Sequence, residues 1–277
     1  MGFMRNLRFD LELLEMSFKY KSYKKLLLEL GRLDHVSEIN EIAVRDFLKQ
    51  LKLSGDENSY LKKKCIEHDI WVSLGNLERI ENIVSLNYIS QVYYCVQDYF
   101  YDFQREYNEI CKSEWRFEEG KTKLFQIQQM FKAKFNKYDF LDEHLIAIFN
   151  YYTEVRDKNS HSRTTNDRDL DKSLTVAKSH LKTLEDVYKI KDSPKSYDTL
   201  DFEDFFLFTQ ATKDLCLKIS SVCIPTSEGL IDTLKLKRFK KLDEERMRNA
   251  IALELRKFYS IEVENSTDIV EEIIQKI

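Results

Sequence analysis

The chain contains very few residues that break helices: 2 prolines and 6 glycines occur in 277 residues. A β-rich domain of this length needs many more residues of these two types for its turns. The shortage therefore predicts an all-α protein, built as a helical bundle. The apolar runs are also shorter than the roughly 18 residues that a membrane-spanning helix needs, so we expect no membrane segment.

Cysteine is sparse and irregularly placed. The five cysteines form no C-x-x-C pair, so they indicate neither a zinc site nor a disulfide framework. We expect a reduced, cytoplasmic environment, with no metal and no cofactor. The first residues, MGFMRNLRFDLELLEM, carry acidic side chains where a signal peptide is apolar. A net charge of −4 argues against a globally basic nucleic-acid-binding protein, although it allows a local basic surface.

The strongest periodic pattern is an apolar seam between residues 77 and 111. Its side chains recur at alternating spacings of three and four residues: Leu86, Ile89, Tyr93, Val96, Phe100, Phe103, Tyr107 and Ile110. This spacing predicts a long helix with one buried face. We expect the seam to be core or a helix-pairing surface, which could also supply the contact between two copies of the chain.

Further helices are predicted before and after this seam. One is expected to begin at an N-cap, Ser37, and to end at Gly55. Others are expected over about 121–136 and from about residue 140 to Arg156. A polar loop, SRTTNDRDLDKS, should follow, then a helix with Leu174, Ala177, Leu181, Leu184 and Tyr188 on one face, and another that opens at TLDFEDFF.

Composition suggests three consecutive regions. Residues 1–76 form an N-terminal helical lobe of unknown role, 77–224 a helical domain, and 225–277 a C-terminal extension with a basic helix and an acidic tail. The sequence CIPTSEG marks the second boundary. The basic segment, 235–257, holds nine Lys or Arg against four Asp or Glu. It could follow phosphates or be a solvated face with i,i+4 ion pairs.

One polar cluster carries side chains suited to chemistry. The sequence YYTEVRDKNSHSR places Arg156, Asp157 and His161 where the helix from about residue 140 runs out. On an ideal helix, Arg156 and His161 are about 140° apart, whereas Asp157 and His161 share a face. Asp157 could therefore orient the imidazole of His161. The same residues could instead be a helix C-terminus with favourable cations and local ion pairs only.

The order of elements and this cluster resemble the HEPN superfamily (higher eukaryotes and prokaryotes nucleotide-binding). The resemblance covers about residues 77–224: a long helix, a second helix, a third that ends in R-D-K-N-S-H, a polar loop and a late amphipathic helix. The family signature is an arginine, usually followed by Asn, Asp or His, with a histidine after four to six residues that intervene between the arginine and the histidine. Here Asp157 replaces the commoner Asn. Arg248 in RNAIAL imitates the signature, but Leu253 stands where the histidine would be.

This resemblance implies a HEPN-like up-down bundle and a metal-independent endoribonuclease that cleaves RNA through its 2′-hydroxyl. It implies a homodimer with a composite site of Arg156, Asp157 and His161, and a toxin or phage-defence role restrained by an antitoxin or regulatory protein. The alternative is a non-catalytic HEPN-like module for binding or dimerisation, antitoxin-like or part of a larger complex. The residue types suit RNA cleavage: histidine transfers protons near neutral pH, and arginine stabilises phosphate charge.

Overall fold

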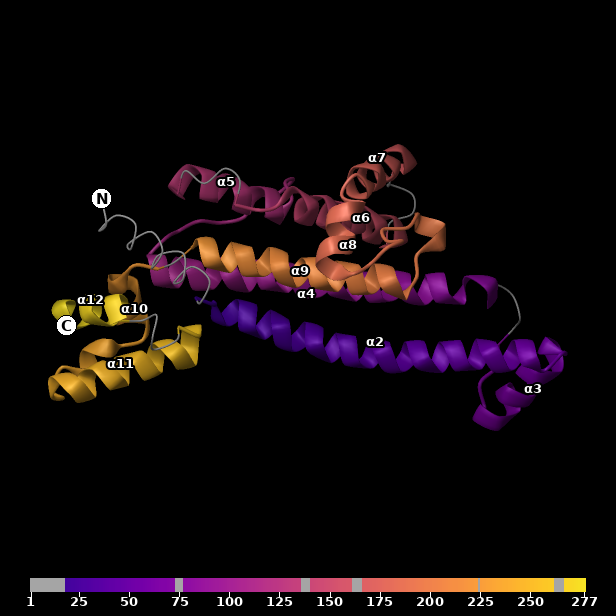
Figure 1. Cartoon of the computed structure of the whole chain (residues 1–277), viewed down its shortest axis with the longest axis horizontal. Helices are drawn as coiled ribbons and strands as arrows, with labels where there is room; N and C mark the ends of the chain where they lie inside the picture. Colours follow the sequence, from indigo (N-terminus) through magenta and orange to yellow (C-terminus); the bar gives the residue numbers. More distant parts are fainter. Residues whose placement is uncertain (1–17, 73–76, 136–139, 161–165, 224, 262–266) are drawn as a thin grey trace. The chain divides into compact units, whose positions relative to one another are not determined.

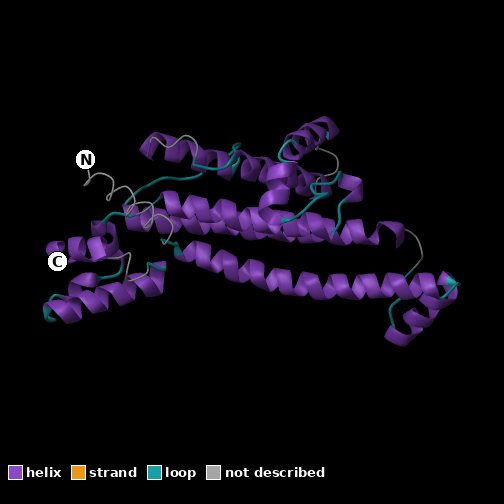
Figure 2. Ribbon diagram, in the orientation of Figure 1, coloured by secondary structure: helices purple, strands orange, loops and turns teal. Residues whose placement is uncertain are grey.

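The computed structural model describes residues 18–72, 77–135, 140–160, 166–223, 225–261 and 267–277. Every regular element in these ranges is helical, which confirms the prediction of an all-α protein (Figure 2). Over the same ranges, no helix combines the length and the apolar character that crossing a membrane requires.

Long and short helices alternate along the chain (Figure 1). In order they are α2 (Lys21–Leu53), α3 (Glu57–His68), η1 (Leu77–Arg79), α4 (Ile80–Cys111), α5 (Lys123–Phe135), α6 (Glu143–Ser160), α7 (Asp167–Lys178), α8 (Leu181–Tyr188), η2 (Tyr197–Thr199), α9 (Phe202–Val222), α10 (Ser227–Thr233), η3 (Leu236–Phe239), α11 (Glu244–Tyr259) and α12 (Thr267–Lys276).

Local chemistry explains where several of these helices start and stop. The Asp56 carboxylate accepts a hydrogen bond from the Ser59 amide at the start of α3, and Asp243 caps α11 in the same way. Such caps satisfy amides that have no partner inside the helix. Asp69, directly after α3, adopts the left-handed conformation that commonly ends helices.

The chain divides into two compact units. The first is assembled from residues within 1–28, 95–142 and 213–277, and the second from residues within 29–94 and 143–212. The units therefore interleave along the sequence. The division into consecutive regions 1–76, 77–224 and 225–277 stays a prediction.

Aromatic rings and buried hydroxyls build the core of the first unit. Phe18 stacks on Tyr259 with ring centroids 5.0 Å apart, and Tyr20 meets Phe103 edge-on at 5.1 Å. The Tyr20 hydroxyl donates to the Cys223 carbonyl at 2.7 Å. Burial of such aromatic surface is the main favourable term in folding, and the hydrogen bond removes the penalty for burying this hydroxyl. Nearby in the same unit, α10 packs against α12, and α11 packs against α12 and η3.

The predicted seam is core. Of its eight side chains, seven are at most 4% exposed, and Tyr93 is half-buried. The seam lies in η1 and α4, whose combined range, residues 77–111, agrees with the prediction. Because these side chains are covered within the chain, the seam is not a surface on which a second copy could dock.

Two of the predicted helix boundaries are wrong. Ser37 does not begin a helix: it lies within α2 and is fully buried. The second wrong boundary is the start of the helix after the polar segment. Asn166 caps α7 by accepting a hydrogen bond from the Arg168 amide, so residues 167–173, which were expected to be loop, are helical. The helix predicted over Leu174 to Tyr188 is interrupted at residues 179–180, between α7 and α8.

Substitutions at two glycines, Gly229 and Gly31, test the packing of α10 against the end of α4. A Cβ at Gly229 in α10 would overlap the backbone carbonyl of Ile110, which cannot move as a side chain tip can, whereas a Cβ at Gly31 in α2 meets nothing within 4 Å. We expect Gly229→Ala to lower the free energy of unfolding by about 1–3 kcal/mol. Gly31→Ala should raise it by about 1 kcal/mol, because alanine loses less backbone entropy in a helix.

Urea denaturation of both variants provides the measurement. The assigned packing of α10 on the end of α4 would be contradicted if Gly229→Ala were as stable as the wild type while Gly31→Ala behaved as expected.

Candidate functional site

Helix α6 carries the candidate site at its C-terminal end, in the second unit. Its buried stripe includes Leu145, Ile148, Tyr152 and Val155, each at most 1% exposed, as the sequence predicts. The helix continues beyond this stripe to Ser160. Arg156 and Asp157 therefore lie in the last two turns, directly after the residues that anchor the helix.

Arg156 is held against two tyrosines of α4. Its guanidinium carbon lies 4.5 Å from the ring centroid of Tyr93 and 5.0 Å from that of Tyr94. Nη1 donates to Oδ1 of Asp157 at 2.6 Å, and the Arg156 side chain is only 16% exposed. Its Nε is buried and has no hydrogen-bond partner among the residues that the structure describes. The guanidinium is thus fixed in orientation while one of its N–H groups is left unused.

The arginine stays charged in this position. Burial alone lowers the pKa of the Arg156 guanidinium, but the hydrogen bond to Asp157 and the neighbouring tyrosines raise it above its usual value on balance. Burial also raises the pKa of Tyr93, and the charge of Asp157 adds to this effect. The site therefore pairs a permanent cation with a neutral phenol at neutral pH.

The structure brings together two of the three predicted site residues. Arg156 and Asp157 are neighbours in space as well as in sequence, and the third, His161, lies outside the described residues. The expected bond between Asp157 and His161 stays a prediction. Asp157 is engaged by Arg156 through Oδ1, and among the described residues its Oδ2 has no hydrogen-bond partner. This carboxylate oxygen is the one that remains for a histidine.

The last turn of α6 is tied to the elements around it. Lys158 forms an ion pair with Asp167, the first residue of α7, at 2.7 Å, and its ammonium lies 4.5 Å from the ring centroid of Tyr197. The Asn159 amide donates to Ser90 Oγ of α4 at 3.3 Å. Together these contacts hold the end of the helix in place as far as Asn159, two residues before His161.

A buried carboxylate below the site fixes the segment between α8 and α9. Asp204 is fully buried and accepts hydrogen bonds from the Tyr152 hydroxyl (2.8 Å) and from the Lys195 amide (2.9 Å) through Oδ1, and from the Asp201 amide (3.1 Å) through Oδ2. The hydroxyl of Tyr151 donates to the Lys195 carbonyl. The two tyrosines that open the YYTEVRDKNSHSR segment therefore attach α6 to this segment.

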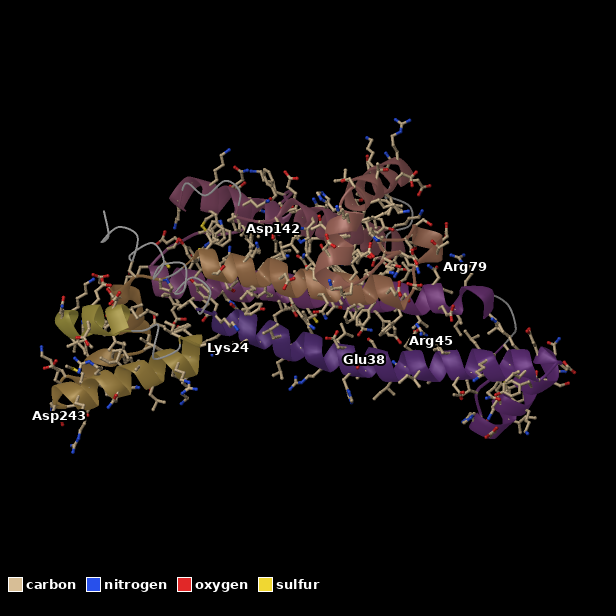
Figure 3. All side chains as sticks on the ribbon, viewed as in Figure 1. Lys24, Glu38, Arg45, Arg79, Asp142 and Asp243 are labelled. Carbon is tan, nitrogen blue, oxygen red and sulfur yellow. The ribbon has the colours of Figure 1, made fainter. Side chains whose placement is uncertain are left out.

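Two further contacts, one from a buried residue and one at the surface, hold the same segment to α4 and to η1. The side-chain amide of Asn82 donates to the Tyr197 carbonyl at 2.8 Å, and Arg79 pairs with Asp198 at 3.3 Å. Arg79 is labelled in Figure 3, which also shows how charged side chains cover the exposed helix surfaces. Since Tyr197 in turn contacts Lys158, this segment supports the end of α6 from a second direction.

Sequence reasoning missed the tyrosines. Tyr93 looks like an ordinary seam residue, and nothing in the sequence distinguishes Tyr94 as a partner of Arg156. Glu154, half-buried two residues before Arg156, has a raised pKa, first because of burial and then because of the charges of Asp157 and Asp169. Side chains two residues apart on a helix do not face each other, so Glu154 is not a partner of Arg156.

The second arginine motif is different in kind. Arg248 lies in α11, where Nε and Nη2 pair with Glu271 at 2.7 Å and Glu244 at 3.1 Å. In the same basic segment, Arg238 pairs with Glu254 at 2.9 Å. These ion pairs favour the interpretation of 235–257 as a solvated helix surface, and not as a path for phosphates.

Comparison with known proteins adds no assignment: no family model matches the chain, and neither a curated protein nor a solved structure matches it. Within the ranges that the structure describes, no group of three or more His, Cys, Asp or Glu side chains could hold a metal ion.

The Asp204 carboxylate should make the free energy of unfolding depend on pH. Burial raises its pKa to about 6, against the hydrogen bonds from Lys195, Asp201 and Tyr152 that lower it. The folded protein therefore keeps this proton between about pH 4 and 6, while the unfolded chain releases it. The free energy of unfolding therefore contains a contribution from the protonated Asp204 that is complete below about pH 4. This contribution, about 2–3 kcal/mol, is lost as the pH rises through 6.

Urea unfolding of the wild type and of Asp204→Asn should be compared from pH 4 to 7.5. We expect the difference in unfolding free energy, wild type minus variant, to fall with rising pH, because asparagine does not titrate. A difference that rises with pH would show that the three hydrogen bonds outweigh burial and that this carboxyl is ionised in the folded protein.

Proposed function

We propose that the chain is a metal-independent endoribonuclease of HEPN type in which Arg156 and His161 act on RNA. The observation that supports this most directly is the position of Arg156. A guanidinium held between Tyr94, half-exposed, and Asp157, with its Nε–H unpaired, is oriented before any substrate arrives. Donors fixed in advance stabilise a developing charge without reorganisation.

The reaction needs three functions. A base takes the proton from the 2′-hydroxyl, which attacks the adjacent phosphorus; an acid protonates the departing 5′-oxygen; and a cation stabilises the charge on the phosphorane. His161 supplies proton transfer, and Arg156 supplies the cation. Asp157 orients Arg156, and its second oxygen can fix the tautomer of His161. The product is an RNA with a 2′,3′-cyclic phosphate and a second RNA with a free 5′-hydroxyl.

One histidine cannot easily serve at both ends of the reaction, so the proposal includes a homodimer in which two copies of the motif face one cleft. The contact must use a surface other than the buried α4 seam. The biological role that fits such an enzyme is a toxin or phage-defence effector restrained by an antitoxin or regulatory protein.

A second function is favoured by the same geometry. The ion pair to Asp157 and the two tyrosine contacts already satisfy most of the Arg156 guanidinium. An arginine seated in this way also stabilises a helix end, as it would in a non-catalytic binding or dimerisation module.

Cleavage of a fluorescent single-stranded RNA separates these functions. We expect the purified wild-type chain to cleave it in the presence of EDTA and to leave a 2′-deoxy analogue intact. His161→Ala should lower the rate by about 10²-fold or more, and Arg156→Ala by about 10²–10³-fold. Arg156→Lys should not restore it, because lysine lacks the planar fork that fits both the tyrosines and a phosphate.

Arg248→Ala is the matched control: it removes another paired arginine from a helix, and it should cleave RNA like the wild type. Thermal unfolding must show that each variant is folded. If the wild type and His161→Ala are both folded and cleave equally, or if neither cleaves any RNA tested, the catalytic assignment is wrong. Loss of stability alone in Arg156→Ala supports the non-catalytic module.

A further inference from the structure

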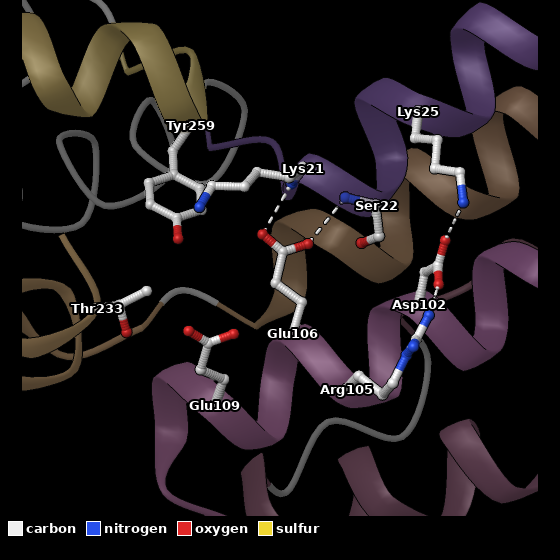
Figure 4. A pocket seen from close by; sticks show the side chains of 9 residues that line it. All are labelled: Lys21, Ser22, Lys25, Asp102, Arg105, Glu106, Glu109, Thr233 and Tyr259. Carbon is white, nitrogen blue, oxygen red and sulfur yellow. Dashed lines mark hydrogen bonds and ion pairs between the residues drawn. The ribbon is translucent and has the colours of Figure 1, made fainter.

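The first unit contains an open pocket of about 530 Å³ that the proposed RNA chemistry does not use. Its walls come from the start of α2, the last turns of α4, the end of α10 and the end of α11 (Figure 4). Charged and hydroxyl side chains line most of it. Some of these side chains are already paired with one another, and others are not.

Two of the three carboxylates of the pocket are fully engaged. Glu106 caps α2: its two oxygens accept from the amides of Lys21 (2.9 Å) and Ser22 (2.8 Å). Asp102 bonds Lys25 at 2.7 Å through one oxygen and Arg105 through the other. These groups form a rigid wall and need no ligand.

Two buried hydroxyls of the pocket are unsatisfied within the part of the chain that the structure describes. Tyr259 is fully buried, yet its hydroxyl has no hydrogen-bond partner among these residues. The Ser22 hydroxyl, in a residue only 5% exposed, also has none among them. Glu109 forms no hydrogen bond or ion pair with the described residues. Figure 4 shows the Glu109 carboxylate and the Tyr259 hydroxyl directed into the same space, beside Thr233. A buried hydroxyl without a partner costs stability, so its retention here points to a ligand.

The electrostatics of this space select a cation. Burial, and then the charges of Glu106 and Glu109, raise the pKa of Tyr259, so the phenol stays neutral and presents oxygen lone pairs as well as a proton. Of the cations that line the pocket, Lys25 and Arg105 are paired with Asp102, and Lys21 is held over the rings of Phe258 (4.7 Å) and Tyr259 (5.4 Å). An anion entering here would meet two carboxylates.

We propose that this pocket binds a primary organic ammonium group, with Glu109 as its counter-ion and the hydroxyls of Tyr259 and Thr233 as hydrogen-bond acceptors. A metal ion would need several free carboxylate oxygens, and those of Glu106 and Asp102 are taken. An ammonium needs one carboxylate and two neutral acceptors, which matches its three donors. The inference is independent of RNA cleavage and concerns the other compact unit.

The binding test uses isothermal titration calorimetry on the full chain with 1,4-diaminobutane as the probe. 1,4-Butanediol, of the same length without charge, is the ligand control, and sodium chloride matches the ionic strength. We expect saturable binding of the diamine only. Glu109→Gln should weaken it about 10-fold or more, and Tyr259→Phe about 3- to 10-fold, as expected for the loss of a charged and of a neutral hydrogen-bond partner.

Glu119→Gln, an exposed acid in the same unit, is the matched control and should bind like the wild type. Tyr259→Phe removes a hydroxyl that has no partner, so its melting temperature should not fall. A short acetylated peptide with one central lysine distinguishes a protein side chain from a free amine as the natural source of the ammonium. Binding of either probe that Glu109→Gln weakens and Glu119→Gln does not supports the site.

The proposal is overturned if neither probe binds more tightly than butanediol, or if the two glutamate variants lose the same affinity. Because RNA cleavage is measured separately on the same variants, failure here leaves the assignment of Arg156 and His161 untouched.

Discussion

The alternating three- and four-residue spacing of apolar side chains along α4 is the constraint on which both compact units depend. Ile80–Tyr94 contributes to the core of one unit, and Cys95–Cys111 to that of the other. A buried stripe of this regularity sets the rotation of the whole helix about its axis. That rotation decides which residues remain at the edge of the stripe. Tyr93 and Tyr94 meet Arg156 there, and Asp102, Glu106 and Glu109 line the pocket.

At the end of α6, several weak interactions act on one guanidinium. An exposed ion pair is worth only about 0–1 kcal/mol, while a cation over an aromatic ring contributes about 0.5–2 kcal/mol, depending on burial. Arg156 has two rings and one carboxylate within reach, and at 16% exposure the rings are its larger source of stability. Asp157 therefore acts mainly on direction: it holds Nη1, while the buried Nε has no hydrogen-bond partner among the described residues.

Much of the fold could be predicted, because regular apolar spacing reports local structure directly. The helices predicted over 77–111 and 121–136 agree with η1, α4 and α5 to within about two residues. The failures concern residues whose role depends on distant partners. Ser37 has the chemistry of an N-cap, but burial within α2 overrides that local preference. Of the candidate site, Arg156 and Asp157 were found by motif, whereas Tyr94 could not be, since only the fold brings it to the arginine.

The unsatisfied polar atoms of the chain differ in what they imply. Ser37, Ser85 and Thr212 have buried hydroxyls without partners among the described residues, but each lies on a helix, where a small rotation reaches the carbonyl of the preceding turn. The Nε of Arg156 and the hydroxyl of Tyr259 belong to rigid planar groups and cannot be satisfied by such a rotation. Native proteins leave few buried groups unpaired. Among the described residues, the hydroxyl of Tyr88 and side-chain amide atoms of Asn82, Gln104 and Asn108 are also buried without a partner, so this feature alone does not mark a site. At Tyr259 the adjoining pocket gives the unpaired hydroxyl its significance.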